Sequence, residues 1–149
     1  MYEFNYHRPS SLDEARRLLD DNGEAVLLAG GMTLLPTMKL RLARPSDLVD
    51  LSRVEGLSRI EDGTSAIVIG ATARHADVAS SERVQKRIPA LADLAAHIGD
   101  AQVRNRGTIG GSLANSDPAA DYPAAVLGLG ATISTNKRKI EADKFFKGL

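Results

Sequence analysis

The sequence predicts a mixed fold of the α/β or α+β class, and three features of its 149 residues support this prediction. A helix-start signal near residue 11 is followed by helical periodicity. An apolar run at 25–29 ends in a glycine pair, as short buried strands often do. A second helical pattern begins at Pro89. Strand-like and helical segments alternate along the whole chain, with no internal repeat and no low-complexity linker, so the length suits one domain or two small ones.

The first elements follow from capping and breaker residues. Ser11 and Glu14 form a capping box, and Leu12, Ala15, Leu18 and Leu19 then fall on one helical face that Gly23 can end. We expect a buried strand at 25–29 and a second helix at 34–42, which tolerates Pro36 only in its first turn and stops before Pro45.

The remaining elements are read in the same way. Apolar runs at 48–51 and 66–69 predict two strands joined through the Asp62–Gly63 turn. Pro89 fits the first turn of a helix whose apolar residues recur at 91, 94, 95 and 98 and which Gly99 ends. A short helix at 122–127 precedes two strands, 131–134 and 139–141, with a solvated tip between them.

Composition excludes several classes of function. Lys plus Arg equals Asp plus Glu, 19 each, which argues against a general nucleic-acid binder. There is no cysteine, so this chain holds no disulfide, thiolate zinc site or cysteine-ligated iron–sulfur cluster. We find no signal-peptide pattern at the N-terminus and no membrane-spanning run, and we expect a cytoplasmic protein.

Two glycine loops share one design. The first runs from Leu28 through Gly30–Gly31 to Leu34, and the second is Gly107-Thr-Ile-Gly-Gly-Ser112. Glycines let backbone N–H groups converge on an anion such as a phosphate, and nearby hydroxyls add donors. Tight turns or close packing explain such glycines equally well. Neither a P-loop nor a G-x-G-x-x-G motif is present, so these patterns predict only a possible dinucleotide cradle.

Other candidate residues favour structural roles. The three histidines are isolated in sequence and lack metal-ligand spacing; His75 is a candidate helix-start residue near a ligand, and His97 a surface residue. Asp117 is expected to cap the turn or helix that Pro118 begins. Arg104 and Arg106 flank the second glycine loop and can either add positive potential or contact solvent or a partner. No serine hydrolase motif is present, and we predict no catalytic side chain and no metal site.

Four stretches of this sequence resemble one known family. They are YHRPSSLDEA, AGGMTLLPTMKLRLARPSDLVDL, IGATARHADV and IGDAQVRNRGTIGGSLANSDPAADYPAAVLGLGATI, which occur in order at plausible spacing over nearly the whole chain. Together they resemble the FAD-binding medium subunit of the carbon monoxide dehydrogenase and xanthine dehydrogenase family of molybdenum hydroxylases.

The resemblance implies a fold and a domain organisation. The fold is the FAD-binding domain of the vanillyl-alcohol-oxidase (PCMH) type, an α+β or mixed α/β fold built from two α/β subdomains. The first subdomain would cover residues 1–50 and the second residues 51–149, the second being incomplete. Medium subunits of the family are nearly twice as long, so we expect a C-terminally truncated chain that lacks the family's C-terminal domain.

The resemblance also implies the cofactor site. Carried over by position, the FAD-binding residues are Ala29, Gly30, Gly31, Met32 and Thr33 in the first loop, and Thr108, Ile109, Gly110, Gly111 and Ser112 in the second, with Asp121 near a hydroxyl of the cofactor. The pyrophosphate of FAD would lie between the two loops. Many relatives carry a polar or imidazole residue where this chain has Met32, so that side chain is not expected to take part.

The function implied is that of an oxidoreductase subunit that transfers electrons. FAD would receive electrons from 2Fe–2S clusters in a small partner subunit and pass them to an external acceptor, while a molybdopterin-binding large subunit oxidises the substrate. This chain would bind and orient FAD, and FAD itself would carry out the redox chemistry. Two alternatives stay open: a truncated structural or assembly module that holds no FAD by itself, and a stand-alone flavin reductase of the same fold.

Overall fold

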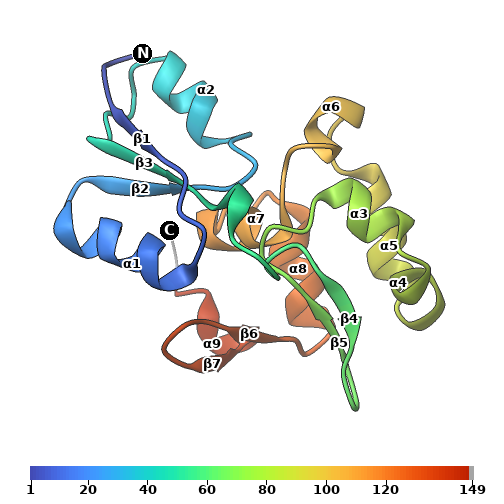
Figure 1. The fold of residues 1–149 in the computed structure, drawn as a ribbon. Helices are drawn as coiled ribbons and strands as arrows, with labels where there is room; N and C mark the ends of the chain where they lie inside the picture. The colour runs from blue at the N-terminus through green and yellow to red at the C-terminus, as the bar shows by residue number, and fades with distance from the viewer. Residues whose placement is uncertain (148–149) are drawn as a thin grey trace.

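A computed structural model describes residues 1–147 of the protein. Figure 1 shows a small sheet flanked by helices at one side of the molecule and a larger, mainly helical part at the other. The chain mixes helices with short parallel and antiparallel strands, so the predicted fold class is confirmed.

The N-terminal sheet has three parallel strands in the order β1–β3–β2: β1 (Asn5–His7), β3 (Asp47–Asp50) and β2 (Ala25–Leu28). All four residues of the central strand β3 are buried, whereas Val26 and Leu27 of β2 are 38% and 43% exposed. The expectation of a buried strand at 25–29 was therefore wrong in its burial, although the strand itself forms. The sequence did not predict β1, which takes the other side of β3 and leaves β2 at the edge.

Carboxylates of β3 hold β1 in place. Asp47 Oδ1 lies 2.7 Å from His7 Nε2, and the Tyr6 hydroxyl donates a hydrogen bond to Asp50. The contact with His7 lowers the pKa of Asp47. Burial opposes the charge of Asp50, but hydrogen bonds from Tyr6 and from Ser52 outweigh it and lower the pKa of this carboxyl too. Buried charges in this strand are thus paired, as a low-dielectric site requires.

Two helices lie on opposite sides of the sheet (Figure 1). Helix α1 (Leu12–Asp21) begins at Ser11, whose Oγ accepts a hydrogen bond from the Glu14 N–H at 3.2 Å, while the Glu14 carboxylate accepts from Ser10 N. Helix α2 (Leu34–Lys39) packs Met38 against Leu28 and Leu48 of the sheet. Both predicted helices are confirmed, the second three residues shorter than expected.

The central part of the chain differs most from the prediction. Strand β5 (Ile67–Ile69) pairs antiparallel with β4 (Ile60–Asp62), a strand the sequence did not predict, and not with β3. The 3₁₀ helix η1 (Leu51–Arg53) follows β3 directly. The Asp62–Gly63 turn therefore closes a local hairpin, in which Gly63 N donates to Ala66 O. The strands predicted at 48–51 and 66–69 both form, but the expectation that this turn joins them was wrong, because it joins β4 to β5.

Three helices pack beside this hairpin: α3 (His75–Ser80), α4 (Glu82–Arg87) and α5 (Pro89–His97). The last is the helix predicted from Pro89, and Gly99 follows it with φ of +53°. The main core cluster lies here, with Val78, Val84, Leu91 and Ala95 buried. His75, expected to start a helix, begins the first of them. The extent of that helix and the whole of the second were not predicted, because each is only six residues long.

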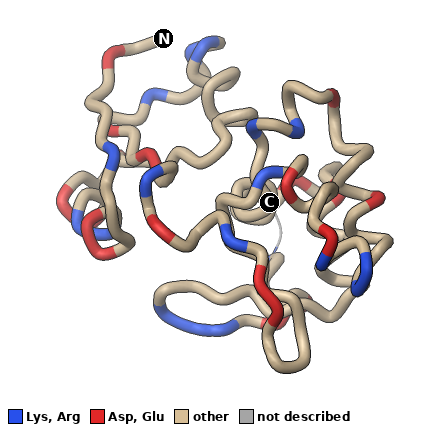
Figure 2. Tube along the Cα trace, turned by 45° about the vertical axis from the view of Figure 1, so that its right-hand side comes forward, with Lys and Arg blue, Asp and Glu red and all other residues tan. Residues whose placement is uncertain are grey.

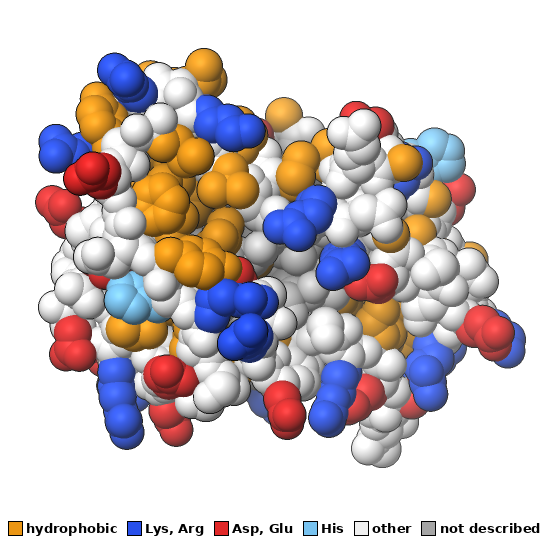
Figure 3. All heavy atoms as spheres, turned by 45° about the horizontal axis from the view of Figure 1, so that its top comes forward, with side chains coloured by type: hydrophobic (Ala, Val, Ile, Leu, Met, Phe, Trp, Pro, Cys, Tyr) orange, Lys and Arg blue, Asp and Glu red, His pale blue; other side chains and the backbone are white. Residues whose placement is uncertain are grey.

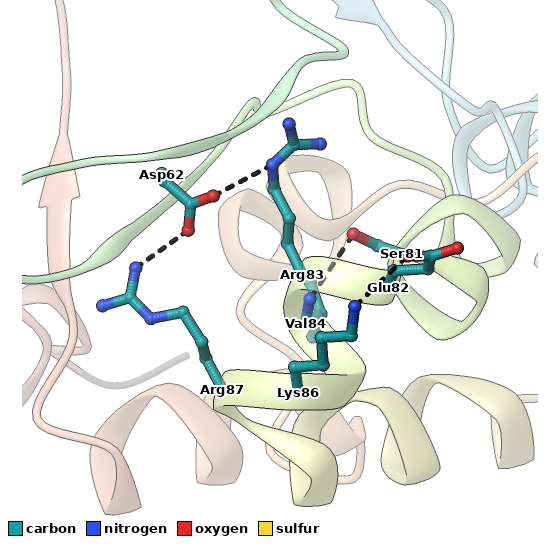
Figure 4. Close-up of polar contacts among 7 residues, drawn as sticks. All are labelled: Asp62, Ser81, Glu82, Arg83, Val84, Lys86 and Arg87. Atoms are coloured by element: carbon teal, nitrogen blue, oxygen red, sulfur yellow. Dashed lines mark hydrogen bonds and ion pairs between the residues drawn. The ribbon is translucent and has the colours of Figure 1, made fainter.

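An ion-pair bracket joins the hairpin to α4 at the surface (Figure 4). Asp62 lies 3.0 Å from Arg83 Nε and 2.9 Å from Arg87 Nη1. The hydrogen bond from Arg87, and then that from Arg83, lowers the pKa of Asp62. All three side chains are substantially exposed, so water screens the pairs.

The C-terminal part contains α6 (Ala101–Arg104), α7 (Ile109–Asn115), α8 (Asp121–Gly128), the antiparallel pair β6 (Thr132–Ser134) and β7 (Lys139–Glu141), and α9 (Ala142–Phe145). The predicted short helix and final strands are confirmed. The second glycine loop is not wholly a loop, because its last four residues form the first turn of α7.

Charges are mixed over the molecule. Figure 2 shows acidic and basic residues interspersed along the trace. Within residues 1–147, no helix is long and apolar enough to cross a membrane.

Candidate functional site

The first glycine loop connects β2 to α2 and leaves its backbone donors free. The N–H groups of Gly30, Gly31, Met32 and Thr33 donate no hydrogen bond to any residue between 1 and 147. The Thr33 side chain is exposed, and its hydroxyl also forms no hydrogen bond within that range. Gly31 has φ of +75°, a conformation that glycine adopts without strain. A short stretch of partly exposed backbone thus presents a row of unsatisfied donors.

The two glycine loops, 76 residues apart in sequence, are in contact. A Cβ atom at Gly30 would overlap the carbonyl oxygen of Arg106 and lie 2.8 Å from Gly107 Cα. On the same side, a Cβ atom at Gly111 would lie 4.0 Å from Ala29 Cβ. The lack of a side chain at Gly30 is what lets the loops meet, whereas the contact from Gly111 to Ala29 would be an ordinary one.

The N–H groups of the second loop are used inside the protein. Ile109 N donates to Ala73 O at 3.1 Å and Gly110 N to Ala71 O at 2.9 Å. Thr108 is the N-cap of α7: its Oγ1 accepts from Gly111 N at 3.1 Å, and its carbonyl accepts from Ser112 N at 3.0 Å. The backbone donors at residues 109–112 are therefore occupied, and the Ser112 hydroxyl remains without a hydrogen bond to residues 1–147.

Gly110 has a packing reason of its own. A Cβ atom there would approach the carbonyl oxygen of Ala71 to 2.5 Å and Ala71 Cβ to 2.6 Å. This glycine lets α7 start against the segment that follows β5. Close packing, one of the two explanations that the sequence left open, thus accounts for Gly110.

A buried histidine lies beneath the second loop. His75, only 5% exposed, starts α3; its N–H donates to Gly107 O, and its Nε2 would lie 2.5 Å from a Cβ atom at Gly107. Its ring centre is 5.2 Å from that of Tyr122, which is fully buried. Neither His75 Nδ1 nor the Tyr122 hydroxyl has a hydrogen-bond partner among residues 1–147.

Burial and charge set the titration of this pair. Burial lowers the pKa of His75, and the nearby Asp121 carboxylate partly offsets the shift. Burial first, and Asp121 second, raises the pKa of Tyr122 far above its ordinary value. Asp121 itself is exposed at the first position of α8. Asp121 directly precedes Tyr122, whose ring contacts His75 beneath the second loop.

The other candidate residues hold the local structure together or lie on the surface. Arg104 Nη1 donates to the carbonyls of Ile98 and Gly99, both at 3.1 Å, and so ties down the end of α5. Asp117 accepts from Ala119 N at 2.9 Å in the turn before α8, as expected for a capping aspartate. His97 is an exposed residue of α5, as predicted. Within residues 1–147 no cluster of three or more His, Asp or Glu residues could hold a metal ion.

Sequence reasoning missed three contributors to the site. They are Ala71, which packs against Gly110, His75, which supports the second glycine loop, and Gly107, where that loop contacts Gly30. Gly107 could have been found from its place in a run of three glycines in five residues. No sequence signal pointed to Ala71, because its role depends on a contact across 39 residues.

A mixed α/β fold with two touching glycine loops and free backbone N–H donors is typical of a domain that binds a phosphate-containing cofactor. Comparison with known proteins identifies the family. Residues 2–149 match the family described as the FAD binding domain in molybdopterin dehydrogenase. The chain belongs to this family.

Curated relatives and solved structures agree with this assignment. The carbon monoxide dehydrogenase medium chain of Hydrogenophaga pseudoflava is 46% identical over 97% of this chain and 52% of its own length. The glyceraldehyde dehydrogenase medium chain of Sulfolobus acidocaldarius is 39% identical over 98% and 53%. A carbon monoxide dehydrogenase structure from H. pseudoflava superposes with a TM-score of 0.95 at 45% identity, covering 99% of this chain and 53% of that one. Quinoline 2-oxidoreductase from Pseudomonas putida 86 gives 0.94 at 38%, with the same coverage. The chain spans about half the length of these relatives.

The residues present fit the cofactor that the family implies. FAD carries a pyrophosphate, and the unsatisfied N–H groups of residues 30–33 are donors of the kind that bind such an anion. The free hydroxyls of Thr33 and Ser112 add two more donors.

Proposed function

We propose that this chain is the FAD-binding part of an electron-transfer subunit in a molybdenum hydroxylase. The observation that carries the proposal is the contact between the two loops, in which Gly30, the first of the four residues with free N–H groups, lies against Arg106 and Gly107 just before α7. When bound, FAD supplies the redox chemistry. The protein supplies binding and orientation, and none of its side chains needs to act as a general acid or base.

Each predicted site residue has a place in this proposal. The backbone of Gly30, Gly31, Met32 and Thr33 would donate to the pyrophosphate, with Ala29 beside Gly111 at the junction of the loops. Thr108 and Ile109 to Ser112 would act mainly through shape, because their N–H groups are occupied, while the Ser112 hydroxyl is free to donate. Asp121, exposed at the start of α8, would accept a hydrogen bond from a cofactor hydroxyl.

Two further proposals concern organisation and partners. Residues 1–50 and 51–149 would form two subdomains; in support, the parallel sheet uses only strands between residues 5 and 50, and the main core cluster only residues beyond 51. The partners would be an iron–sulfur small subunit and a molybdopterin large subunit. In support, relatives are named medium chains or FAD subunits, and this chain has no cysteine for a cluster.

Flavin binding tests the proposal directly. The visible spectrum of the purified protein is recorded before and after incubation with excess FAD and desalting. Retained flavin bands support the cradle, and replacing Gly110 and Gly111 together by valine should abolish them. If the double variant keeps full flavin occupancy, the assignment of the second loop is wrong. If the folded wild-type protein takes up no flavin, even with its partner subunits, the assembly-module alternative replaces the proposal. Electron transfer from FAD without molybdenum partners would instead favour the stand-alone reductase.

A further inference from the structure

Gly107, where the second glycine loop meets the first, has a contact on each of two sides. A Cβ atom at Gly30 would lie 2.8 Å from Gly107 Cα, and a Cβ atom at Gly107 would lie 2.5 Å from His75 Nε2. The backbone N–H of His75 also donates a hydrogen bond to Gly107 O at 3.0 Å. The first loop therefore limits the movement of Gly107 in one direction, and the imidazole ring limits it in another.

The ring of His75 is itself held in place. Its side chain starts α3 and is buried, and its ring centre lies 5.2 Å from that of Tyr122 in the first turn of α8. Tyr122 is fully buried and belongs to the main core cluster with Val78 and Ile109. Because a protein interior is close-packed, the imidazole has no space into which it could retreat from Gly107.

Hydrogen bonding does not explain why these two rings are present. Neither His75 Nδ1 nor the Tyr122 hydroxyl has a hydrogen-bond partner among residues 1–147. A buried polar atom without a partner destabilises a fold. Burial also lowers the pKa of His75, so the ring is uncharged at neutral pH. The two rings therefore act on the second loop through their shape and rigidity.

This packing extends to the free donors of the first loop. Gly30 is the first of four residues whose N–H groups donate no hydrogen bond to residues 1–147. Its contact with Gly107 is between backbone atoms, which cannot rotate away, so a shift of Gly107 also shifts the first loop. On the face that Figure 3 shows, much of the surface between the two parts of the molecule is backbone and uncharged polar atoms, with Lys and Arg side chains at its edge. Such a surface suits an anionic ligand.

We propose that His75 is a positioning residue of the FAD site. Its ring, supported by Tyr122, keeps Gly107 against Gly30 and so holds the free N–H groups of the first loop where the pyrophosphate binds. The inference rests on the proposed function, because it takes FAD as the ligand. It makes the affinity for FAD depend on a side chain that lies beneath the loops and acts only through them.

An exchange of side-chain size between positions 75 and 107 tests this proposal. The full chain is purified with the subunits that accompany it, and Kd is measured by flavin titration. His75→Ala opens space into which Gly107 can retreat from Gly30, whereas Gly107→Ala forces a methyl group against the ring. Each change should raise Kd for FAD about tenfold.

The double variant His75→Ala/Gly107→Ala should recover most of the affinity. Its added methyl group occupies part of the space that the ring has left, so Kd should stay within about threefold of the wild-type value, whereas independent effects would multiply to about a hundredfold. Recovery is expected to be partial, because a Cβ atom at Gly107 would also lie 3.2 Å from Val103 O.

Val84→Ala is the matched control for a loss of stability alone. Val84 is fully buried in the same core cluster, but on α4, which packs against α3, α5 and β4. This variant should lower the melting temperature and leave Kd for FAD unchanged at temperatures where the protein is folded. The ³¹P NMR signals of bound FAD should move in His75→Ala, return toward the wild-type positions in the double variant, and stay unmoved in Val84→Ala. If His75→Ala does not fold, the less drastic His75→Asn takes its place.

Each contrary outcome overturns the inference. If His75→Ala lowers the melting temperature but keeps the wild-type Kd and ³¹P signals, His75 is only a part of the core. If the double variant binds FAD as weakly as the product of the two single effects, Gly107 is not held between the first loop and the ring. A wild-type protein that takes up no flavin, even with its subunits, refutes the proposed function, and the inference fails with it. Flavin uptake by the wild type with unchanged affinity in the variants refutes the inference alone.

Discussion

Replacing Gly30 by alanine should separate the two glycine loops. The added Cβ would overlap the Arg106 carbonyl oxygen and approach Gly107 Cα to 2.8 Å, which is 0.6 Å short of the 3.4 Å at which ordinary contact begins. Both neighbours are backbone atoms and cannot rotate away, so one loop must move. Overpacking of this kind typically costs about 1–3 kcal/mol.

The same displacement should weaken cofactor binding. If the strain falls on the bound form, about 1–3 kcal/mol corresponds to an increase in Kd for FAD of roughly 5- to 150-fold. Stability is measured by urea denaturation with circular dichroism, and affinity by flavin titration after desalting. Gly23→Ala is the control, because a Cβ atom there meets nothing within 4 Å and its φ is not positive. Its effect should be neutral or stabilising by at most about 1 kcal/mol.

One pattern would refute this reasoning. If Gly30→Ala matches Gly23→Ala in both midpoint and FAD affinity, the loops are not held in the contact described, and the cradle does not depend on it. If stability falls but flavin affinity does not, the contact is structural only, and the free N–H groups of the first loop are not the pyrophosphate donors.

Three further predictions follow from the site and its surroundings. Burial lowers the pKa of His75 in the folded chain, so the unfolded chain binds more protons and the free energy of unfolding falls as the pH drops below the ordinary pKa of 6.5. In His75→Gln, urea-denaturation midpoints measured at several pH values should fall less steeply toward acid pH than those of the wild type. An equal slope in both proteins contradicts this prediction. Thr108→Ala removes the hydroxyl that accepts a hydrogen bond from Gly111 N, and it should lower the free energy of unfolding, measured by denaturation, by about 1 kcal/mol. Thr108→Ser keeps a hydroxyl and should retain most of that stability. An equal loss of stability in both variants argues against the capping role. Asp62→Asn removes the exposed ion pairs with Arg83 and Arg87 and should change the melting temperature little at high salt. A large fall in melting temperature at high salt would mean that these ion pairs are structurally essential.

Elements defined by local signals were predictable. The helix at Ser11 and the helix at Pro89 carry their own caps and apolar faces within ten residues or so, and the structure confirms both. The strands at 132–134 and 139–141 were found because they pair with each other across a short turn. Local hydrogen bonding and side-chain periodicity determine such elements before the chain folds as a whole.

Elements defined by partners far along the chain were not predictable. Strand β1 is only three residues long and exists because β3, forty-two residues away, offers it a free edge and two carboxylates. The burial of β2 was misjudged for the same reason, since its position in the sheet depends on where β1 lies. Strand β4 was missed because Ile60–Asp62 shows no alternation long enough to read.

The sequence by itself determined the fold class, the capped helices, the two glycine loops and, through its resemblance, the family. Only the tertiary structure decided how those glycines work. Gly30 allows the loops to touch, Gly110 makes room for Ala71, and the donors of the second loop are already occupied, which leaves the first loop as the source of free N–H groups. The physical reason is that a missing side chain matters through what lies opposite it, and in a folded chain the opposite atoms come from residues far away in sequence.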